Sequence, residues 1–339
     1  MQRKNTLYQI LLIVGAIAFG SASGQPALAQ PAVKKVREFQ FNYGATLKEL
    51  PDGAKVRVWV PVPASDSHQS AKLSQFTGDG QLEQHTEEKY GNSIGYFELT
   101  AGEVGTSKFE LVYQVARKEA GADGTVELSE QQKASFLAAN RLVPIDGRPT
   151  ELIEGDLPAE PTAAAAKLYD VVEQHMKYDK SKPGYGNGDS VWACDSKTGN
   201  GTDFHSLFIS LARSKSLPAR FEIGFPLPTD TQAGAIKGYH CWAWFFAKGK
   251  GWHPVDISEA DKHPELKDYY FGKLTPDRIA FSTGRDIKLV PESSAEPLNY
   301  FVYPHVEVDG KQWPKEKIEL AFSFKDVETA DASSTDSEK

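Results

Sequence analysis

The chain has 339 residues, of which 40% are apolar and 25% are charged. This length predicts two domains or three small ones, and the composition excludes both a disordered chain and a protein with many membrane spans. The 38 basic and 46 acidic residues give a net charge of −8, and no stretch concentrates lysine and arginine. We therefore expect no nucleic acid among its partners.

Residues 1–29 have the pattern of an export signal. Two basic residues, Arg3 and Lys4, precede an apolar run at 10–19, and an Ala-Leu-Ala cleavage site follows at 27–29. The run is about ten residues long, too short to cross a ~30 Å hydrocarbon core as a helix. A membrane anchor is the alternative. We predict a signal that is cleaved, an exported chain that is periplasmic or secreted, and no stable membrane insertion afterwards.

Residues 30–116 predict an N-terminal β-sandwich. The segments 56–60 and 109–115 alternate in polarity with the period of a strand, and glycine-containing turns separate the candidate strands. Several short strands at this spacing are typical of a sandwich. Residues 117–160 are more polar and predict a linker with one short helix near 130–140.

Residues 161–325 predict an α+β domain. A helix is expected from 162 to about 178, a glycine-rich loop from 183 to 200, and a buried helix at 202–214, where apolar residues recur at helical spacing. Strands are expected after these helices, at 219–225, 239–247, 252–257, 300–308 and 318–324. Helices followed by an antiparallel sheet indicate the α+β class. Residues 326–339 predict a disordered acidic tail.

A hairpin in this domain brings a histidine close to an aspartate. Residues paired across a hairpin have a constant index sum, and the sum of 496 for His240 and Asp256 centres their pairing near the turn at 248–251. Side chains directly opposite have Cβ atoms about 5 Å apart. Such an aspartate orients a histidine that acts as a general base, although a purely structural pair is the alternative.

A general base of this kind activates a nucleophile, and helix N-termini lower the pKa of a thiol. The loop at 198–201 leads directly into the helix at 202–214, but it contains no cysteine. The two cysteines of the chain, Cys194 and Cys241, lie elsewhere. They could form one disulfide or remain inert buried thiols.

Five segments, in this order and at this spacing, resemble the transglutaminase-like superfamily. They are WAC at 192–194, GNGTDFHSLF at 199–208, LPAR at 217–220, GYHCW at 238–242 and GWHPVDISEA at 251–260. The resemblance spans about residues 162–290. It implies a papain-like α+β core, preceded in bacterial members by a β-sandwich, with a Cys–His–Asp triad that transfers the acyl group of an amide through a thioester.

The resemblance assigns roles residue by residue. His240 matches the base and Asp256 its orienting partner, whereas the nucleophile falls on Gly201, which has no side chain. Trp192 is the candidate for the oxyanion or cleft wall, together with Trp242. Because removing a triad nucleophile costs on the order of 10⁶ in kcat, the resemblance implies a catalytically impaired protein that binds peptide or protein segments in the cleft.

Two alternatives remain open from the sequence. The chain could be an active thiol acyltransferase or cysteine protease that uses Cys194, or it could belong to an active lineage in which Gly201 reflects a recent or artefactual change from cysteine. Cys241 is the weaker substitute, because strand alternation directs it away from the face of His240. No spacing of metal ligands or of phosphate-binding glycines matches a known pattern, so we expect neither a metal nor another cofactor.

Overall fold

The computed structural model describes residues 36–124 and 126–327, and the predicted export signal and most of the predicted tail lie outside them. The described residues fall within one compact unit that starts at Lys34. Within these ranges, no helix combines the length and the apolar character needed to cross a membrane.

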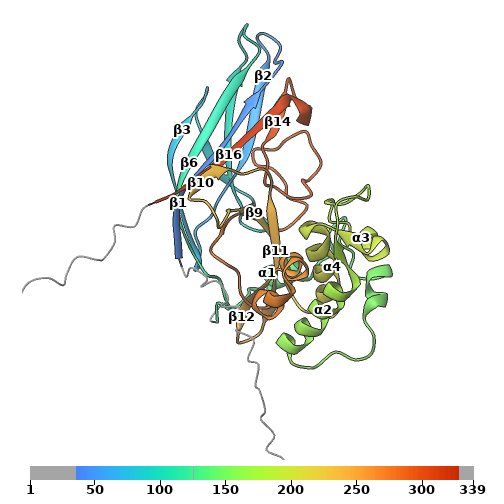
Figure 1. Ribbon diagram of the computed structural model, residues 1–339. Helices are drawn as coiled ribbons and strands as arrows, with labels where there is room; N and C mark the ends of the chain where they lie inside the picture. The colour runs from blue at the N-terminus through green and yellow to red at the C-terminus, as the bar shows by residue number, and fades with distance from the viewer. Residues whose placement is uncertain (1–35, 125, 328–339) are drawn as a thin grey trace, which may run out of the picture. The chain divides into compact units, whose positions relative to one another are not determined.

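Two five-stranded antiparallel sheets form the sandwich (Figure 1). Their orders are β10-β16-β1-β6-β3 and β15-β14-β2-β5-β4. The strands are β1 (Val36–Leu47), β2 (Lys55–Val62), β3 (Gln69–Thr77), β4 (Glu83–Thr86), β5 (Ser93–Thr100), β6 (Ser107–Lys118), β10 (Ala233–Ala235), β14 (His305–Val308), β15 (Lys311–Gln312) and β16 (Ile318–Asp326). The N-terminal strands predicted from the alternating segments are therefore present.

The C-terminal strands complete the sandwich instead of extending the second domain. β16 pairs with β1, placing Phe324 opposite Phe41, and β14 pairs with β2, placing Val306 opposite Val58. The domain boundary predicted at residue 325 differs from this arrangement. The sequence pattern marks a strand, but it does not say which sheet the strand joins.

The second part of the chain contains a four-stranded antiparallel sheet in the order β12-β11-β9-β13. Its strands are β9 (Ala219–Pro226), β11 (His240–Ala247), β12 (Gly251–Val255) and β13 (Arg278–Thr283). The α-helices are α1 (Glu130–Leu137), α2 (Pro161–His175), α3 (Ser190–Ser196), α4 (Gly201–Ser214), α5 (Ile257–Lys262) and α6 (Lys267–Tyr270). Short 3₁₀ turns occupy Arg148–Leu152, Pro264–Leu266 and Lys315–Lys317, and β7 (Lys177–Tyr178) pairs in parallel with β8 (Thr198–Gly199). This α+β architecture confirms the predicted fold class.

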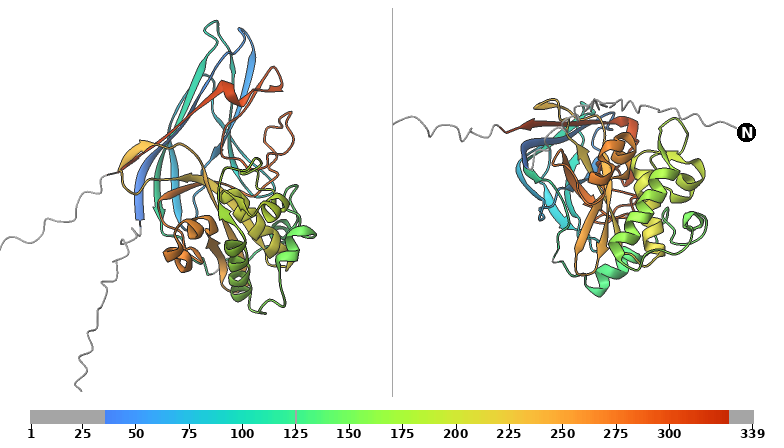
Figure 2. Two further views of the ribbon diagram at one scale, coloured as in Figure 1. Left: turned by 45° about the vertical axis from the view of Figure 1, so that its right-hand side comes forward. Right: turned by 60° about the horizontal axis from the view of Figure 1, so that its bottom comes forward.

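Helix α4 is the central helix of this part. It packs against β11 and β9 and against α2 and α3, which Figure 2 shows grouped beside the sheet. Nearly all of its residues are buried, including polar ones. Its start is fixed by a capping box in which the Asn200 side chain accepts from Thr202 N and the Asp203 carboxylate accepts from Asn200 N.

Three predicted boundaries differ from the structure. α3 lies within the segment predicted as a glycine-rich loop, because Asp189 caps a seven-residue helix too short to show a helical period. The strand predicted at 252–257 ends at Val255, where Asp256 caps α5. Of the stretch at 300–308, only His305–Val308 is a strand.

Sandwich and four-stranded sheet share one apolar core. The ring of Phe225 on β9 packs against those of Phe41 and Phe322 in the sandwich, with centroids 5.3 and 4.6 Å away. Buried residues from both parts belong to the same continuous cluster. The strands that carry the candidate site are therefore held rigidly by packing on the sandwich.

Candidate active site

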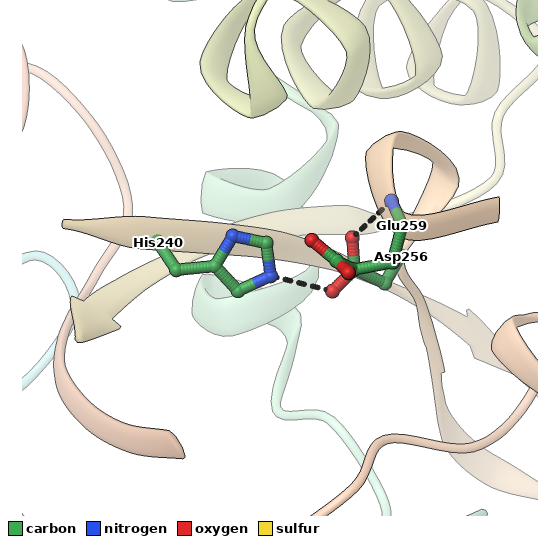
Figure 3. Close-up of side chains that lie close together, drawn as sticks. All are labelled: His240, Asp256 and Glu259. Carbon is green, nitrogen blue, oxygen red and sulfur yellow. Dashed lines mark hydrogen bonds and ion pairs between the residues drawn. The ribbon is translucent and has the colours of Figure 1, made fainter. Parts of the chain in front are cut away.

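The predicted pair of His240 and Asp256 is present. Nε2 of His240 lies 2.7 Å from Oδ2 of Asp256 (Figure 3). The pairing differs from the predicted register, because Ala243 is opposite Val255, an index sum of 498 rather than 496. The two side chains are thus diagonal neighbours, and Asp256 reaches His240 from just beyond the end of β12.

Asp256 is held as a buried carboxylate. Its Oδ1 accepts hydrogen bonds from Ser258 Oγ at 3.1 Å and from Glu259 N at 3.2 Å, since Asp256 is the N-cap of α5. Its Oδ2 accepts from Arg278 Nη1 at 2.8 Å, in addition to its bond with His240. Burial alone raises the pKa of Asp256, but the charges of His240 and Arg278 outweigh it and hold the pKa well below the usual range.

Arg278 was not predicted from the sequence. It begins β13, which lies at the far side of β9 from β11, and its guanidinium stands 4.9 Å from the Trp242 ring. Arg278 is 3% exposed, so it is a buried counter-ion for Asp256. No local pattern marks this residue, because its partner lies 22 residues earlier in the chain and only the sheet order brings the two together.

Gly201 is the first residue of α4 and lines the cavity that contains His240. A Cβ atom built on Gly201 would lie 3.0 Å from Ser258 Oγ and 3.2 Å from Cys241 Sγ. These contacts are tight but involve side-chain atoms, so a shift of a few tenths of an ångström would admit the Cβ atom. The position stands at the positive end of a helix.

Both cysteines are free thiols in the structure, so the disulfide considered from the sequence is not formed. Cys194 lies on α3 with its Sγ 3.8 Å from Arg148 O, and burial raises its pKa. Cys241 lies on β11, and burial raises its pKa well above the usual range. Neither thiol is therefore a thiolate at neutral pH.

Cys241 faces α4, as strand alternation predicts, and meets a second histidine there. Its Sγ is 3.8 Å from Nδ1 of His205, whose Nε2 accepts a hydrogen bond from Ile257 N. Burial lowers the pKa of His205 to about 4, so the ring is neutral and its one proton is on Nδ1. His205 therefore donates toward Cys241 and does not remove the proton of its thiol.

The cavity beside Gly201 has a volume of about 330 Å³. Its lining is rich in tyrosine and also contains asparagine, glycine and one lysine, together with His240 and Cys241. The lining residues are Tyr178, Lys180, Tyr185, Gly186, Asn187, Asn200, Gly201, Gly238, Tyr239, His240, Cys241, Tyr300 and Tyr303. We call this space the Gly201 cavity. Its hydroxyl and amide groups suit a polar chain, and its rings suit an apolar side chain.

The two tryptophans assigned to the cleft do not line this cavity. Trp192, on α3, has its indole against Gly184, and Trp242 is fully buried. Nε1 of Trp242 donates a short hydrogen bond to Glu222 on β9, which also accepts from Trp244 Nε1. Neither Trp192 nor Trp242 is therefore among the residues that line the cavity, although alternation along β11 places Trp242 on the same face as His240.

Asp203 fixes the loop that forms one wall of the cavity. Its carboxylate is fully buried and accepts from Gly186 N at 2.7 Å and from Gly188 N at 2.9 Å. Tyr239 closes the same region with its hydroxyl 2.9 Å from Thr202 Oγ1. The helix start and the loop are thereby built as one rigid rim.

His240, Asp256 and Glu259 offer ligand atoms within 4.8 Å of one another (Figure 3). A cation at this place would stand beside the guanidinium of Arg278, which already bonds to Asp256 Oδ2. The charge of Arg278 opposes a metal ion there. The arrangement therefore fits an oriented histidine better than a metal centre.

The three candidate triad positions lie within a part of the chain that matches a known family. Residues 151–257 match the model of the transglutaminase-like superfamily. This segment contains Gly201, His240 and Asp256, so the match supports the resemblance seen in the sequence motifs over these residues.

Three comparisons extend beyond this core. The chain is 26% identical over 345 residues to an uncharacterized protein of Haemophilus influenzae, covering 87% of this chain and 93% of that protein. A crystal structure of a candidate cysteine protease from Cytophaga hutchinsonii has a TM-score of 0.52 at 15% identity, covering 86% of this chain and 100% of the other. The periplasmic domain of TgpA from Pseudomonas aeruginosa, bound to ethylmercury, has a TM-score of 0.36 at 16% identity, covering 68% and 91%. The Cytophaga likeness shows that the fold is shared along most of the chain.

Proposed function

We propose that this protein is an exported, catalytically impaired member of the transglutaminase-like superfamily that binds peptide or protein segments in the Gly201 cavity. One observation carries the proposal: a glycine begins α4 at the wall of a cavity that His240 also lines, and His240 is hydrogen-bonded to the buried Asp256 behind it. The base and its orienting carboxylate are present without a nucleophile.

Other groups near Gly201 do not supply that nucleophile. The thiol of Cys241 is protonated and its sulfur accepts a weak hydrogen bond from the Nδ1–H group of His205, and the hydroxyl of Thr202 is hydrogen-bonded to that of Tyr239. Cys194 is fully buried and does not line the cavity. These contacts count against the alternative in which Cys194 acts as the nucleophile of an active thiol enzyme.

The second alternative, an active lineage with a recent change from cysteine, draws support from the retained geometry. Arg278 still neutralises Asp256, and Asp256 still orients His240. Export rests on the pattern of residues 1–29 alone.

Binding without turnover can be measured directly. The probe is a fluorescein-labelled ten-residue peptide that alternates glutamine and tyrosine, since acyl transfer in this superfamily starts from an amide. We expect saturable binding by fluorescence anisotropy, and no change in peptide mass after a day with or without an added amine. Loss of ammonia or cleavage of the probe would contradict the impaired assignment.

A blocking variant locates the binding. Gly238 lines the cavity, and a Cβ built on it would meet no atom within 4 Å, so Gly238→Trp places an indole in open space. We expect this variant to fold normally and to lose peptide binding. Lys72→Glu, an exposed change on β3 outside the cavity, is the matched control and should bind like the wild type.

A further inference from the structure

A second cavity continues the Gly201 cavity along the molecule. Its volume is about 520 Å³, and it shares Asn187, Tyr300 and Tyr303 with the first. Its lining includes Trp313, which directly follows β15, and Leu320, which lies on β16. We call it the Trp313 cavity. The shared residues make the two cavities direct neighbours, and we refer to the two together as the depression.

The lining of this depression carries one sign of charge. No aspartate or glutamate is among the described residues that line either cavity, although the whole chain has a net charge of −8. Its exposed cations are Lys180 at the Gly201 cavity and Arg141 and Lys315 at the Trp313 cavity. Over the described residues, none of these three forms an ion pair, so their charges are available to a ligand.

Apolar side chains accompany these charges in the Trp313 cavity. Leu320 is 39% exposed, and Trp313 and Ile318 are half-buried beside it. Trp313 is held in place because its Nε1 donates to Lys48 O at 3.2 Å. A ligand that fits must therefore present apolar groups as well as negative charge, which a polypeptide does and an anionic glycan does not.

We propose that the two cavities form one extended peptide site, and that the Trp313 cavity selects segments in which acidic residues stand next to apolar ones. Carboxylates of the bound segment face Arg141 and Lys315, and an apolar side chain contacts Trp313 and Leu320. The segment then continues past Tyr300 into the Gly201 cavity. This inference rests on the proposed function, for which it specifies the ligand class.

The test compares the alternating glutamine and tyrosine peptide with the same peptide carrying glutamate in place of glutamine. At low ionic strength, we expect the glutamate peptide to bind wild-type protein about tenfold more tightly, since it can form exposed charge pairs with Arg141 and Lys315. The advantage should shrink at 0.5 M salt because exposed charges are screened. In Arg141→Glu/Lys315→Glu, the advantage should disappear while the glutamine peptide keeps its affinity.

The controls separate this inference from the proposed function. Lys72→Glu reverses one positive charge at a position that lines neither cavity. It should preserve the tighter binding of the glutamate peptide. Equal affinity of wild-type protein for both peptides, or an advantage that survives the double charge reversal, would overturn the acidic selection while Gly238→Trp still tests the proposed function. If neither peptide binds, both proposals fail.

The acidic residues after Val327 allow one further test of the proposal. A chain ending at Val327 removes four acidic residues that could compete for the same cations. We expect it to bind the glutamate peptide as the full chain does. Binding by the shortened chain alone would mean that the site is filled by the chain's own end, and would overturn selection of a separate partner.

Discussion

Replacing Arg278 with methionine tests whether this residue is the counter-ion that keeps Asp256 ionised. Methionine preserves apolar contact with Trp242 but removes the donor that lies 2.8 Å from Asp256 Oδ2. Asp256 is fully buried, and removing one member of a buried ion pair costs about 3–5 kcal/mol. We expect about 3 kcal/mol, the lower end, because His240 still hydrogen-bonds to Asp256 and because Nε of Arg278 has no hydrogen-bond partner among the described residues.

Urea unfolding at pH 7 gives the free energy of unfolding of four proteins: wild type, Arg278→Met, Asp256→Asn and the double variant. Asparagine retains the ability to cap α5, so it removes mainly the charge. The double variant should recover about 2 kcal/mol relative to Arg278→Met, since no buried charge is left uncompensated. A loss below 1 kcal/mol in Arg278→Met, with no recovery in the double variant, would refute the counter-ion role.

Three further predictions follow from the same environment. Asp203→Ala leaves the amides of Gly186, Gly188 and the helix start without an acceptor, so we expect a loss of about 3 kcal/mol and faster hydrogen exchange in this loop, whereas unchanged exchange would contradict its anchoring role. His205 has a folded pKa of about 4, below its unfolded value, so its contribution to stability is complete above pH 6.5 and falls by about 3 kcal/mol as the pH drops to 4. His205→Gln should flatten this part of the stability profile, and an unchanged slope would exclude His205 as the cause. In native protein at pH 8, Cys194 and Cys241 should both resist a disulfide reagent that labels them at once after unfolding, and fast labelling of either would contradict their burial.

Features of the fold with a local signal could be predicted from the sequence, whereas long-range partners could not. The apolar spacing of α4 and the turn at Gly251 are local, so the buried helix and the hairpin with His240 and Asp256 were predicted, although the register was off by two. β16 pairs with β1, which lies near the other end of the described chain. Alternation of polarity marks each of these segments as a strand but does not say which strand is its partner.

The candidate site shows the same division. The resemblance identified Gly201, His240 and Asp256 by motif, and the structure brings His240 and Gly201 to one cavity. It could not identify Arg278, which reaches Asp256 only through the order of strands in the sheet. Trp242 was assigned to the cleft, but its side chain is fully buried and donates a hydrogen bond to Glu222.

The central claim is that the site lacks only its nucleophile. The most direct test is the rate at which a thiol electrophile labels the protein at pH 6, measured by intact mass for wild type, Gly201→Cys and Gly201→Cys/His240→Gln. At this pH ordinary thiols, with a pKa of about 8.5, are almost wholly protonated. We predict fast single labelling of Gly201→Cys, slow labelling of the double variant and none of wild type. Fast labelling of wild type would reveal a working thiol and contradict the account, and so would a Gly201→Cys protein that reacts no faster than its double variant.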